Sequence, residues 1–223
     1  MSKTFFITGI SSGLGLELTK QLLAKNHRVV GTYFHNSSEL EVIKNPNLSY
    51  FKVDNFDYKS TAQIISQIKD IDVFINNAGV YTSGELESYD PEKIIQLINT
   101  NLTGAILTTQ AVLPIMKAKN EGVIFFVNSI NGVENKALSS VYGASKWGLR
   151  GFATNLRVDL KNTNIQVLNF YPAGMQTELF KNAGVDKDLE NYMTIEDVAT
   201  LVIDTIENIK KYIVQELVLN RWR

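Results

Sequence analysis

The chain has 223 residues, of which 44% are hydrophobic and 20% are charged, and its formal net charge is −1. These values suit one compact domain with a sizeable core, and they exclude a strongly basic protein that binds nucleic acid or an anionic membrane. Because the chain contains no cysteine and only two histidines, His27 and His35, thiolate metal sites and disulfides are excluded, and we expect no His-based metal site or Ser-His-Asp triad.

The apolar run at the N-terminus is too short for a secretory signal peptide and enters a glycine turn at once. No apolar stretch approaches the roughly 18 residues that a membrane-spanning helix needs. We therefore expect a soluble, cytoplasmic protein with no membrane partner.

Short apolar runs alternate with amphipathic segments along the chain, and this alternation is typical of a parallel sheet wrapped by helices. Strands are predicted at Thr4–Thr8, Arg28–Tyr33, Leu48–Val53, Val73–Ile75, Val123–Val127, Gln166–Phe170 and Glu216–Leu219. The predicted fold class is therefore α/β, a doubly wound, Rossmann-type parallel sheet of seven strands with helices on both faces. We expect a single domain over residues 1–223.

Four helices are predicted: one beginning at Gly13, one from Asp90 to about Met116, one from about Val141 to Leu160, and one beginning at Thr194. The first places Leu14, Leu18 and Leu22 on one face. Asp90 and Thr194 are side chains that cap helix N-termini well. No repeat or linker interrupts this pattern.

A glycine-rich turn follows the first strand and opens the first helix. Its candidate ligand-binding residues are Gly9, Ser11, Ser12, Gly13, Leu14 and Gly15. Backbone N–H groups are unpaired at a helix N-terminus and the helix dipole is positive there, so a pyrophosphate is well placed. Gly9 permits the tight turn, Gly13 a close approach of phosphate, and Gly15 close packing of helix and strand. An ordinary strand-to-helix turn without a ligand would have the same composition.

Polar residues also follow the third and fourth predicted strands. Asp54 and Asn55 end one strand, and Asn76-Asn77-Ala78-Gly79 ends the next. Ligands of open α/β sheets bind at this carboxyl edge. Both segments are also compatible with polar turns that serve structure alone.

Tyr142 and Lys146 lie four residues apart on the third predicted helix, so both side chains share one face. A free Tyr has a pKa of about 10 and is a poor acid-base catalyst near neutrality unless a cation stabilises its phenolate. Ser129, at the end of the fifth strand, is suited to hold a substrate oxygen beside the tyrosine. Taken singly, each is also compatible with a core aromatic, a solvated lysine or a turn residue.

Taken in order along nearly the whole chain, these motifs resemble those of the short-chain dehydrogenase/reductase family. The resemblance implies an NAD(P)-dependent oxidoreductase that moves a hydride between nicotinamide and a small carbonyl or secondary alcohol substrate, with Tyr142 as acid-base catalyst. It implies a catalytic set of Asn101, Ser129, Tyr142 and Lys146, in which Asn101 disturbs its helix and holds a water that extends a proton relay from Lys146. A dinucleotide-binding redox sensor with little turnover is the alternative.

The resemblance also assigns coenzyme contacts. Asp54 meets the adenine with backbone support from Asn55; Asn77, Ala78 and Gly79 line the path of the ribose; Lys146 reaches the ribose hydroxyls beside Tyr142; and Pro172, Gly174 and Thr177 approach the nicotinamide. This chain departs from the family pattern at Ala173, where Gly is usual, with the Gly one position later.

The end of the second strand bears on the choice of coenzyme. NAD-specific enzymes carry an acidic residue there, which accepts from the ribose 2′-OH and repels a 2′-phosphate. Here Tyr33 stands at that position, so NADP(H) is favoured over NAD(H). The Arg or Lys of the phosphate-binding branch is missing, because Phe34 and Ser12 occupy its usual places. The expected preference is therefore modest.

Two further expectations rest on the resemblance. Residues 178–193 form a short substrate flap, with Val133, Leu138 and Phe180 as candidate pocket walls. The helices around Asn101 and Tyr142 carry apolar residues beyond one inward stripe, and in the family these helices pair across a two-fold axis. We therefore expect a homodimer or homotetramer.

Overall fold

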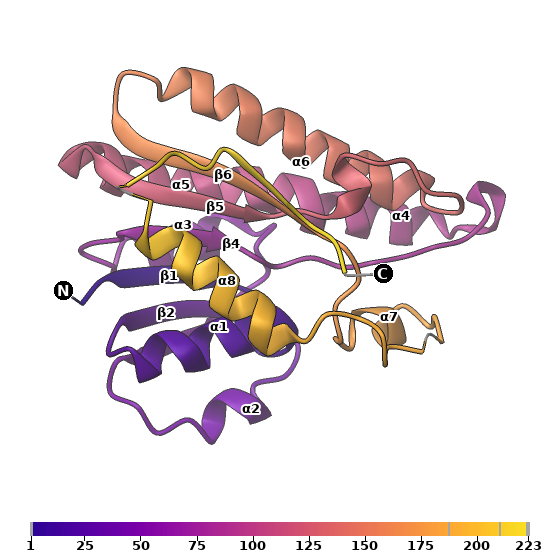
Figure 1. Ribbon diagram of the computed structural model, residues 1–223, viewed down its shortest axis with the longest axis horizontal. Coiled ribbons are helices and arrows are strands. Elements are labelled where there is room, and N and C mark those ends of the chain that lie inside the picture. Colours follow the sequence, from indigo (N-terminus) through magenta and orange to yellow (C-terminus); the bar gives the residue numbers. More distant parts are fainter. Residues whose placement is uncertain (1, 187, 210, 222–223) are drawn as a thin grey trace.

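The computed structural model describes residues 2–186, 188–209 and 211–221. Seven strands form one parallel sheet in the order β3-β2-β1-β4-β5-β6-β7 (Figure 1). The strands are β1 (Thr4–Thr8), β2 (Arg28–Tyr33), β3 (Leu48–Lys52), β4 (Val73–Asn76), β5 (Glu121–Val127), β6 (Asn164–Pro172) and β7 (Glu216–Leu219). The predicted fold class is confirmed. Residues 1, 187, 210 and 222–223 of the predicted domain lie outside the described residues.

The helices are α1 (Gly13–Ala24), α2 (Ser38–Glu41), α3 (Tyr58–Ile65), α4 (Pro91–Ile98), α5 (Gly104–Lys119), α6 (Ser140–Asp159), α7 (Leu179–Asn182) and α8 (Ile195–Glu207). The prediction of one helix from Asp90 to Met116 is wrong, because a π-helical turn at Asn99–Thr103 separates α4 from α5. The short helices α2, α3 and α7 were not predicted. Asp90 and Thr194 do cap α4 and α8 through their side chains.

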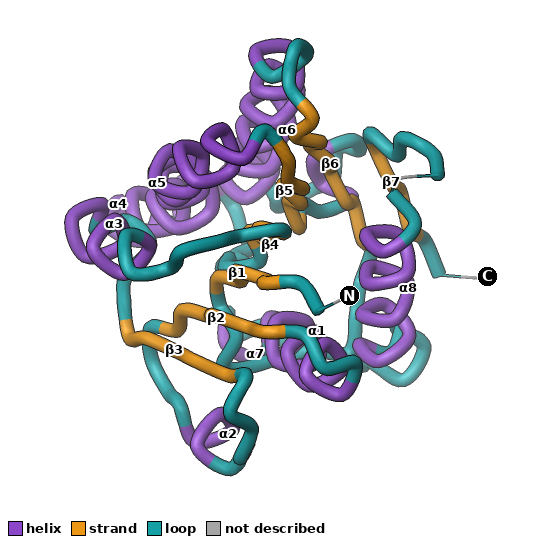
Figure 2. Tube along the Cα trace, turned by 90° about the vertical axis from the view of Figure 1, so that its left-hand side faces the viewer, coloured by secondary structure: helices purple, strands orange, loops and turns teal. Residues whose placement is uncertain are grey.

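Helices cover both faces of the sheet (Figure 2). Successive strand residues point to opposite faces, so Phe5 and Ile7 enter the core beneath α1 and α8, while Phe6 enters the core beneath α3, α5 and α6. All three side chains are fully buried. Burial on both faces explains why the strands read as continuous apolar runs.

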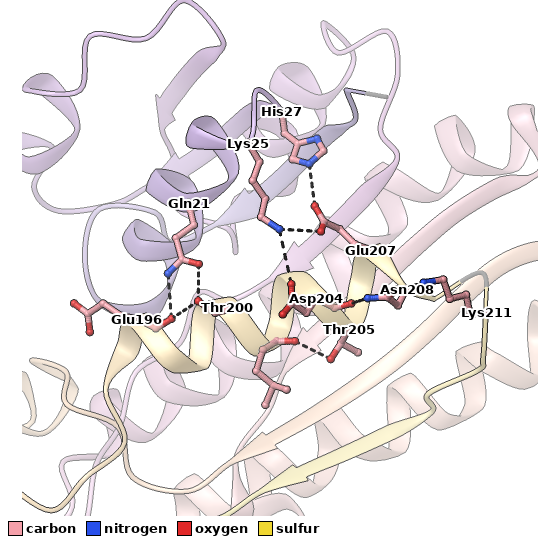
Figure 3. A network of polar contacts seen from close by, with 11 residues as sticks. Gln21, Lys25, His27, Glu196, Thr200, Asp204, Thr205, Glu207, Asn208 and Lys211 are labelled. Atoms are coloured by element: carbon pink, nitrogen blue, oxygen red, sulfur yellow. Dashed lines mark hydrogen bonds and ion pairs between the residues drawn. The ribbon is translucent and has the colours of Figure 1, made fainter.

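Helix α8 is tied to α1 by polar contacts at the surface (Figure 3). Lys25 Nζ donates to Glu207 at 2.9 Å, and Thr200 Oγ1 donates to Gln21 at 3.0 Å. The backbone N–H of Lys3 donates to His27 Nδ1, so the ring carries its proton on Nε2 and donates it to Glu207 at 3.3 Å. Such exposed contacts contribute little energy singly, but together they fix the position of α8 along α1.

The strand order reverses between β1 and β4, since the chain runs outward from β1 through β2 and β3 and returns on the other side of β1. In open α/β sheets this switch point opens a crevice at the carboxyl ends of the strands. Among the described residues, no helix has the length and apolarity to span a bilayer, and no cluster of three or more His, Asp or Glu side chains is positioned to hold a metal ion.

Candidate active site

The glycine turn between β1 and α1 has a backbone that favours glycine at two positions, because φ is +73° at Gly9 and +52° at Gly13. The N–H groups of Gly9 and Ile10 both donate to Thr32 O, at 2.8 and 3.0 Å. A Cβ placed on Gly15 would lie 2.2 Å from Gly9 O. The turn therefore packs directly against α1 and leaves the helix N-terminus at the sheet edge.

Asn77 locks this turn to the end of β4. Its Nδ2 donates to Thr8 O at 3.0 Å and to Gly9 O at 2.9 Å. The N–H groups of Asn77 and Ala78 donate to the Thr8 hydroxyl at 3.1 and 3.0 Å. Across the crevice, a Cβ on Gly13 would lie 3.5 Å from Thr177 Cγ2. The glycine turn, the Asn77 segment and Thr177 thus meet at the switch point.

The other sequence-predicted coenzyme residues lie at the ends of β2 and β3. Tyr33 is half-buried with its ring edge against Tyr50, the ring centroids 5.9 Å apart. Asn55 Oδ1 accepts from the Thr32 hydroxyl at 3.1 Å. Asp54 Oδ1 accepts from the N–H of Phe56 at 3.1 Å, so its carboxylate also shapes the local turn.

The π-helical turn aims Asn101 at the loop after β4. Asn101 is buried, its Oδ1 accepts from Val80 N at 2.8 Å, and its Nδ2 donates to Val80 O at 2.9 Å and to the Ser145 hydroxyl at 3.2 Å. π-helical turns inside α-helices frequently occur at functional sites. A Cβ on Gly79 would lie 3.3 Å from Asn101 Oδ1 and 3.7 Å from Lys146 Nζ, so this glycine separates the two side chains.

Tyr142 and Lys146 lie on α6 and are buried, with 5% and 4% of their surfaces exposed. Lys146 Nζ lies 5.7 Å from the centroid of the Tyr142 ring and donates to Val127 O at 3.4 Å. Burial lowers the pKa of Lys146 to about 8. Burial also raises the pKa of Tyr142 to about 12, against a hydrogen bond with Ser129 that lowers the pKa and a repulsive contribution from Tyr81 that raises it.

Ser129 follows β5 and is held by its neighbour Asn128. Ser129 N donates to Asn128 Oδ1 at 3.0 Å, and Asn128 Nδ2 donates to Lys146 O at 3.2 Å. Asn128 is buried and therefore fixes the end of β5 against α6. Sequence reasoning missed Asn128, although a polar residue directly between an apolar strand and Ser129 is a signal that could have identified it.

The departure at Ala173 and Gly174 has a structural reason. A Cβ on Gly174 would lie 1.8 Å from Tyr192 Cε1, so the Tyr192 ring packs directly on the Gly174 backbone. Met193 N donates to Gly174 O at 3.3 Å, and Ala173 N donates to Leu219 O at 2.8 Å. The segment after Pro172 is thus held between β7 and the end of the predicted flap.

A chain of four aromatic rings runs from Tyr142 into this flap. Tyr81 contacts Tyr142 with centroids 4.8 Å apart, Phe180 contacts Tyr81 at 5.2 Å, and Tyr192 contacts Phe180 at 5.8 Å. We call Tyr81, Phe180 and Tyr192 the aromatic wall. Phe180 was predicted by position, whereas Tyr81 and Tyr192 were missed.

The other two candidate pocket walls, Val133 and Leu138, stand outside this chain of rings. Leu138 is 49% exposed and has φ of +58°, and its carbonyl accepts from Gly84 N at 2.9 Å. The aromatic wall is partly carried by α7, which lies at the end of the sheet away from the N-terminus (Figure 1). Residue 187 of the predicted flap lies outside the described residues.

Known proteins resemble this chain in sequence. The family model for short chain dehydrogenases matches residues 3–188. A probable NADP-dependent dehydrogenase of Haemophilus influenzae is 30% identical over 221 residues, covering 96% of this chain and 88% of that protein. Human retinol dehydrogenase 8 is 33% identical over 187 residues, and the matched segment is 79% of this chain and 60% of that protein.

Solved structures show the same architecture. Serine dehydrogenase complexed with NADP+ superimposes with a TM-score of 0.90 at 27% identity, covering 97% of this chain and 94% of that chain. A short-chain dehydrogenase/reductase from Vibrio parahaemolyticus gives a TM-score of 0.87 at 29% identity, covering 98% and 100%. The chain therefore belongs to the short-chain dehydrogenase/reductase family of oxidoreductases.

Proposed function

We propose that this protein transfers a hydride between a nicotinamide dinucleotide and a small carbonyl or secondary alcohol substrate, with Tyr142 as acid-base catalyst. The observation that carries the proposal is the buried pair of Tyr142 and Lys146, with Ser129 hydrogen-bonded to the tyrosine. Burying a lysine and a tyrosine hydroxyl costs free energy, and buried groups with shifted pKa values cluster at functional sites.

The residues present fit a dinucleotide. Gly9 and Gly13 have positive φ angles and no side chain that would block the approach of a phosphate. Within the described chain, the Ser12 side chain makes no capping hydrogen bond to α1. Its helix N-terminus therefore offers N–H donors to a pyrophosphate. Lys146 has an ammonium group with three donors and a long bond of 3.4 Å to Val127 O, so it is suited to bind ribose hydroxyls. When bound, the coenzyme supplies or accepts the hydride at the substrate carbon.

The side chains of Ser129, Tyr142 and Lys146 position the substrate and transfer the proton. In the direction of reduction, Ser129 donates a hydrogen bond to the carbonyl oxygen, and Tyr142 Oη gives its proton to that oxygen as the alcohol forms. Tyr142 is then a phenolate, which the Lys146 ammonium stabilises by charge. Asn101 holds Val80 and lies next to Lys146 across Gly79, where a water would extend the path of the returning proton.

We propose NADP(H) over NAD(H) as the coenzyme. Tyr33 carries no charge that repels a 2′-phosphate. One relative is named an NADP-dependent dehydrogenase, and the serine dehydrogenase structure is a complex with NADP+. The remaining proposed coenzyme contacts are Asp54, Asn55, Asn77, Ala78, Pro172, Gly174 and Thr177.

We further propose a cytoplasmic homodimer or homotetramer that pairs through α4, α5 and α6. Ile95, Trp147 and Val158 on this layer are 59%, 42% and 60% exposed, and large apolar side chains gathered on one layer favour an interface. Light scattering at micromolar concentration should give at least twice the mass of one chain. A single-chain mass would contradict the assembly.

The decisive experiment follows absorbance of the reduced nicotinamide with a panel of aldehydes, ketones and diketones. Tyr142→Phe should lower kcat about a thousandfold while the dissociation constant of the coenzyme stays within about twofold. Tyr58→Leu, an exposed change on α3, is the matched control. Turnover retained in Tyr142→Phe would refute the catalytic role, and coenzyme binding without turnover of any carbonyl would favour the redox-sensor alternative.

A further inference from the structure

The aromatic wall bears on which carbonyl compounds the site accepts. Tyr81, Phe180 and Tyr192 are half-buried and continue a chain of edge-to-face ring contacts from Tyr142, in the order Tyr142, Tyr81, Phe180 and Tyr192, with interplanar angles from 69° to 77°. Tyr81 is the ring that contacts both Tyr142 and Phe180. A substituent that extends from a substrate oxygen at the Tyr142 hydroxyl towards the flap therefore meets the wall at Tyr81.

The backbone before Tyr81 is fixed by Asn101. Both the N–H and the carbonyl of Val80 are hydrogen-bonded to the Asn101 side chain, at 2.8 and 2.9 Å. The Tyr81 ring also packs between the rings of Tyr142 and Phe180. Because both the preceding backbone and the ring are held in place, the Tyr81 side chain loses little conformational entropy when a substrate binds. Tyr81 thus presents a preformed flat surface.

Two charged residues flank Phe180 on the flap, and both of their side chains are mostly exposed. Glu178 and Lys181 pair with each other at 3.1 Å, and their side chains are 62% and 81% exposed. At the far end of the wall, the Arg221 guanidinium lies 5.3 Å from the Tyr192 ring centroid. The rings nearest Tyr142 therefore offer apolar faces and hydroxyl edges, which suit a neutral substrate.

We propose that Tyr81, supported by Phe180, is a specificity-determining residue that selects neutral carbonyl compounds with a flat aryl group next to the carbonyl. The inference rests on the proposed function, because it deepens the substrate class of that site. An aryl group can join the wall edge to face, and a saturated ring of the same carbon skeleton cannot. One or two such contacts correspond to about a tenfold preference.

Acetophenone and cyclohexyl methyl ketone form a matched pair for the test, since they share a carbon skeleton and differ in whether the ring is flat. The ratio of their kcat/KM values in a variant, divided by that in the wild type, removes their different intrinsic reactivities. Tyr81→Leu should lower the aryl preference about tenfold, and Tyr81→Phe should keep it within about twofold. Tyr58→Leu should leave it unchanged. If Tyr81→Leu does not fold, Phe180→Leu on the surface flap should lower the same ratio.

Failure of the inference is distinguishable from failure of the proposed function. An unchanged ratio in Tyr81→Leu, with turnover intact, overturns the role of Tyr81 and leaves the hydride-transfer proposal standing. If neither ketone is turned over, binding of acetophenone to the coenzyme-free protein is measured by saturation-transfer NMR. Binding lost in Tyr81→Leu and kept in Tyr58→Leu then supports the aromatic wall as an aryl site, and equal binding in all three proteins overturns it.

Discussion

The glycine turn after β1 and the Tyr142–Lys146 end of α6 lie at the same edge of the sheet, but one is built from backbone and the other from buried side chains. In the turn, the Asn77 side chain donates hydrogen bonds to the carbonyls of Thr8 and Gly9, and the Thr32 carbonyl accepts from the N–H groups of Gly9 and Ile10. At the other end, the Lys146 ammonium is buried with a hydrogen bond of 3.4 Å.

This difference follows from what each region has to do. A turn that binds phosphate has to hold N–H groups in place, and close packing of small residues achieves this while also stabilising the fold. A group that exchanges a proton needs a pKa that its surroundings have shifted, and burial shifts a pKa by disfavouring the charged form. We therefore expect substitutions in the two regions to change stability in opposite directions.

The largest expected effect is on the turn. Gly15→Ala places a Cβ 2.2 Å from Gly9 O, so backbone has to move, and we expect a loss of about 3 kcal/mol in the free energy of unfolding together with weaker coenzyme binding. Gly151→Ala on α6 is the matched control, since its Cβ would meet no described atom of its own chain within 4 Å. Urea denaturation should show Gly151→Ala gaining about 0.5–1 kcal/mol. Equal effects of the two changes would contradict the comparison.

At the other end, Lys146→Met should stabilise the protein by about 1–3 kcal/mol at pH 7 while it abolishes turnover. The gain depends on pH, because the Lys146 pKa is about 8 in the folded chain and 10.5 ordinarily. Below pH 8 both states carry the charge and the folded state bears the full cost of burying it. Between pH 8 and 10.5 the folded state has lost the proton that the unfolded state keeps, so wild-type stability rises with pH.

The gain from Lys146→Met should therefore shrink as the pH rises from 8 towards 10.5. Denaturation midpoints at pH 7, 8.5 and 10 measure this directly. Lys20→Met, on the exposed face of α1, controls for the general effect of removing a lysine. A Lys146→Met variant less stable than the wild type at pH 7 would show that the interactions of the Lys146 ammonium outweigh the free-energy cost of burying it.

The smallest expected effect concerns coenzyme choice at the turn. Tyr33 removes repulsion of a 2′-phosphate without adding a cation, so kcat/KM should favour NADPH over NADH by about tenfold, or about 1.4 kcal/mol. Tyr33→Asp should reverse the preference, and Tyr33→Phe should leave it nearly unchanged. A clear advantage for NADH in the wild type would show the interpretation of Tyr33 to be wrong.

Most of the fold could be predicted because buried parallel strands leave continuous apolar runs, as at Val123–Val127. Helix α3 could not, since its sequence from Tyr58 to Ile65 is short and includes three β-branched residues. The capping side chain of Asp57, which accepts from Ser60 N at 3.2 Å, was a signal for its start. The break at Asn99–Thr103 could not be read from helical periodicity, which continues through it.

The candidate site could be predicted where the chemistry depends on residues in a fixed order, as at Tyr142 and Lys146. The aromatic wall could not, because Tyr81 and Tyr192 come from loops more than 100 positions apart, and the tertiary fold brings each of them against Phe180. Likewise, the shift of glycine to position 174 has no explanation in its own segment. Its reason is the Tyr192 ring, which arrives from the far end of the flap.

The contact between α1 and α8 has a consequence for how the protein is made. Leu18 and Leu22 of α1 pack in one core with Val202 and Ile206 of α8, and Lys25 and Gln21 bind the same helix (Figure 3). A growing chain emerges from the ribosome N-terminus first, so α1 can pack on the early strands but waits for nearly the entire chain before α8 covers it. A chain that stops before Ile195 therefore leaves the part of α1 that α8 covers open to water and to chaperones.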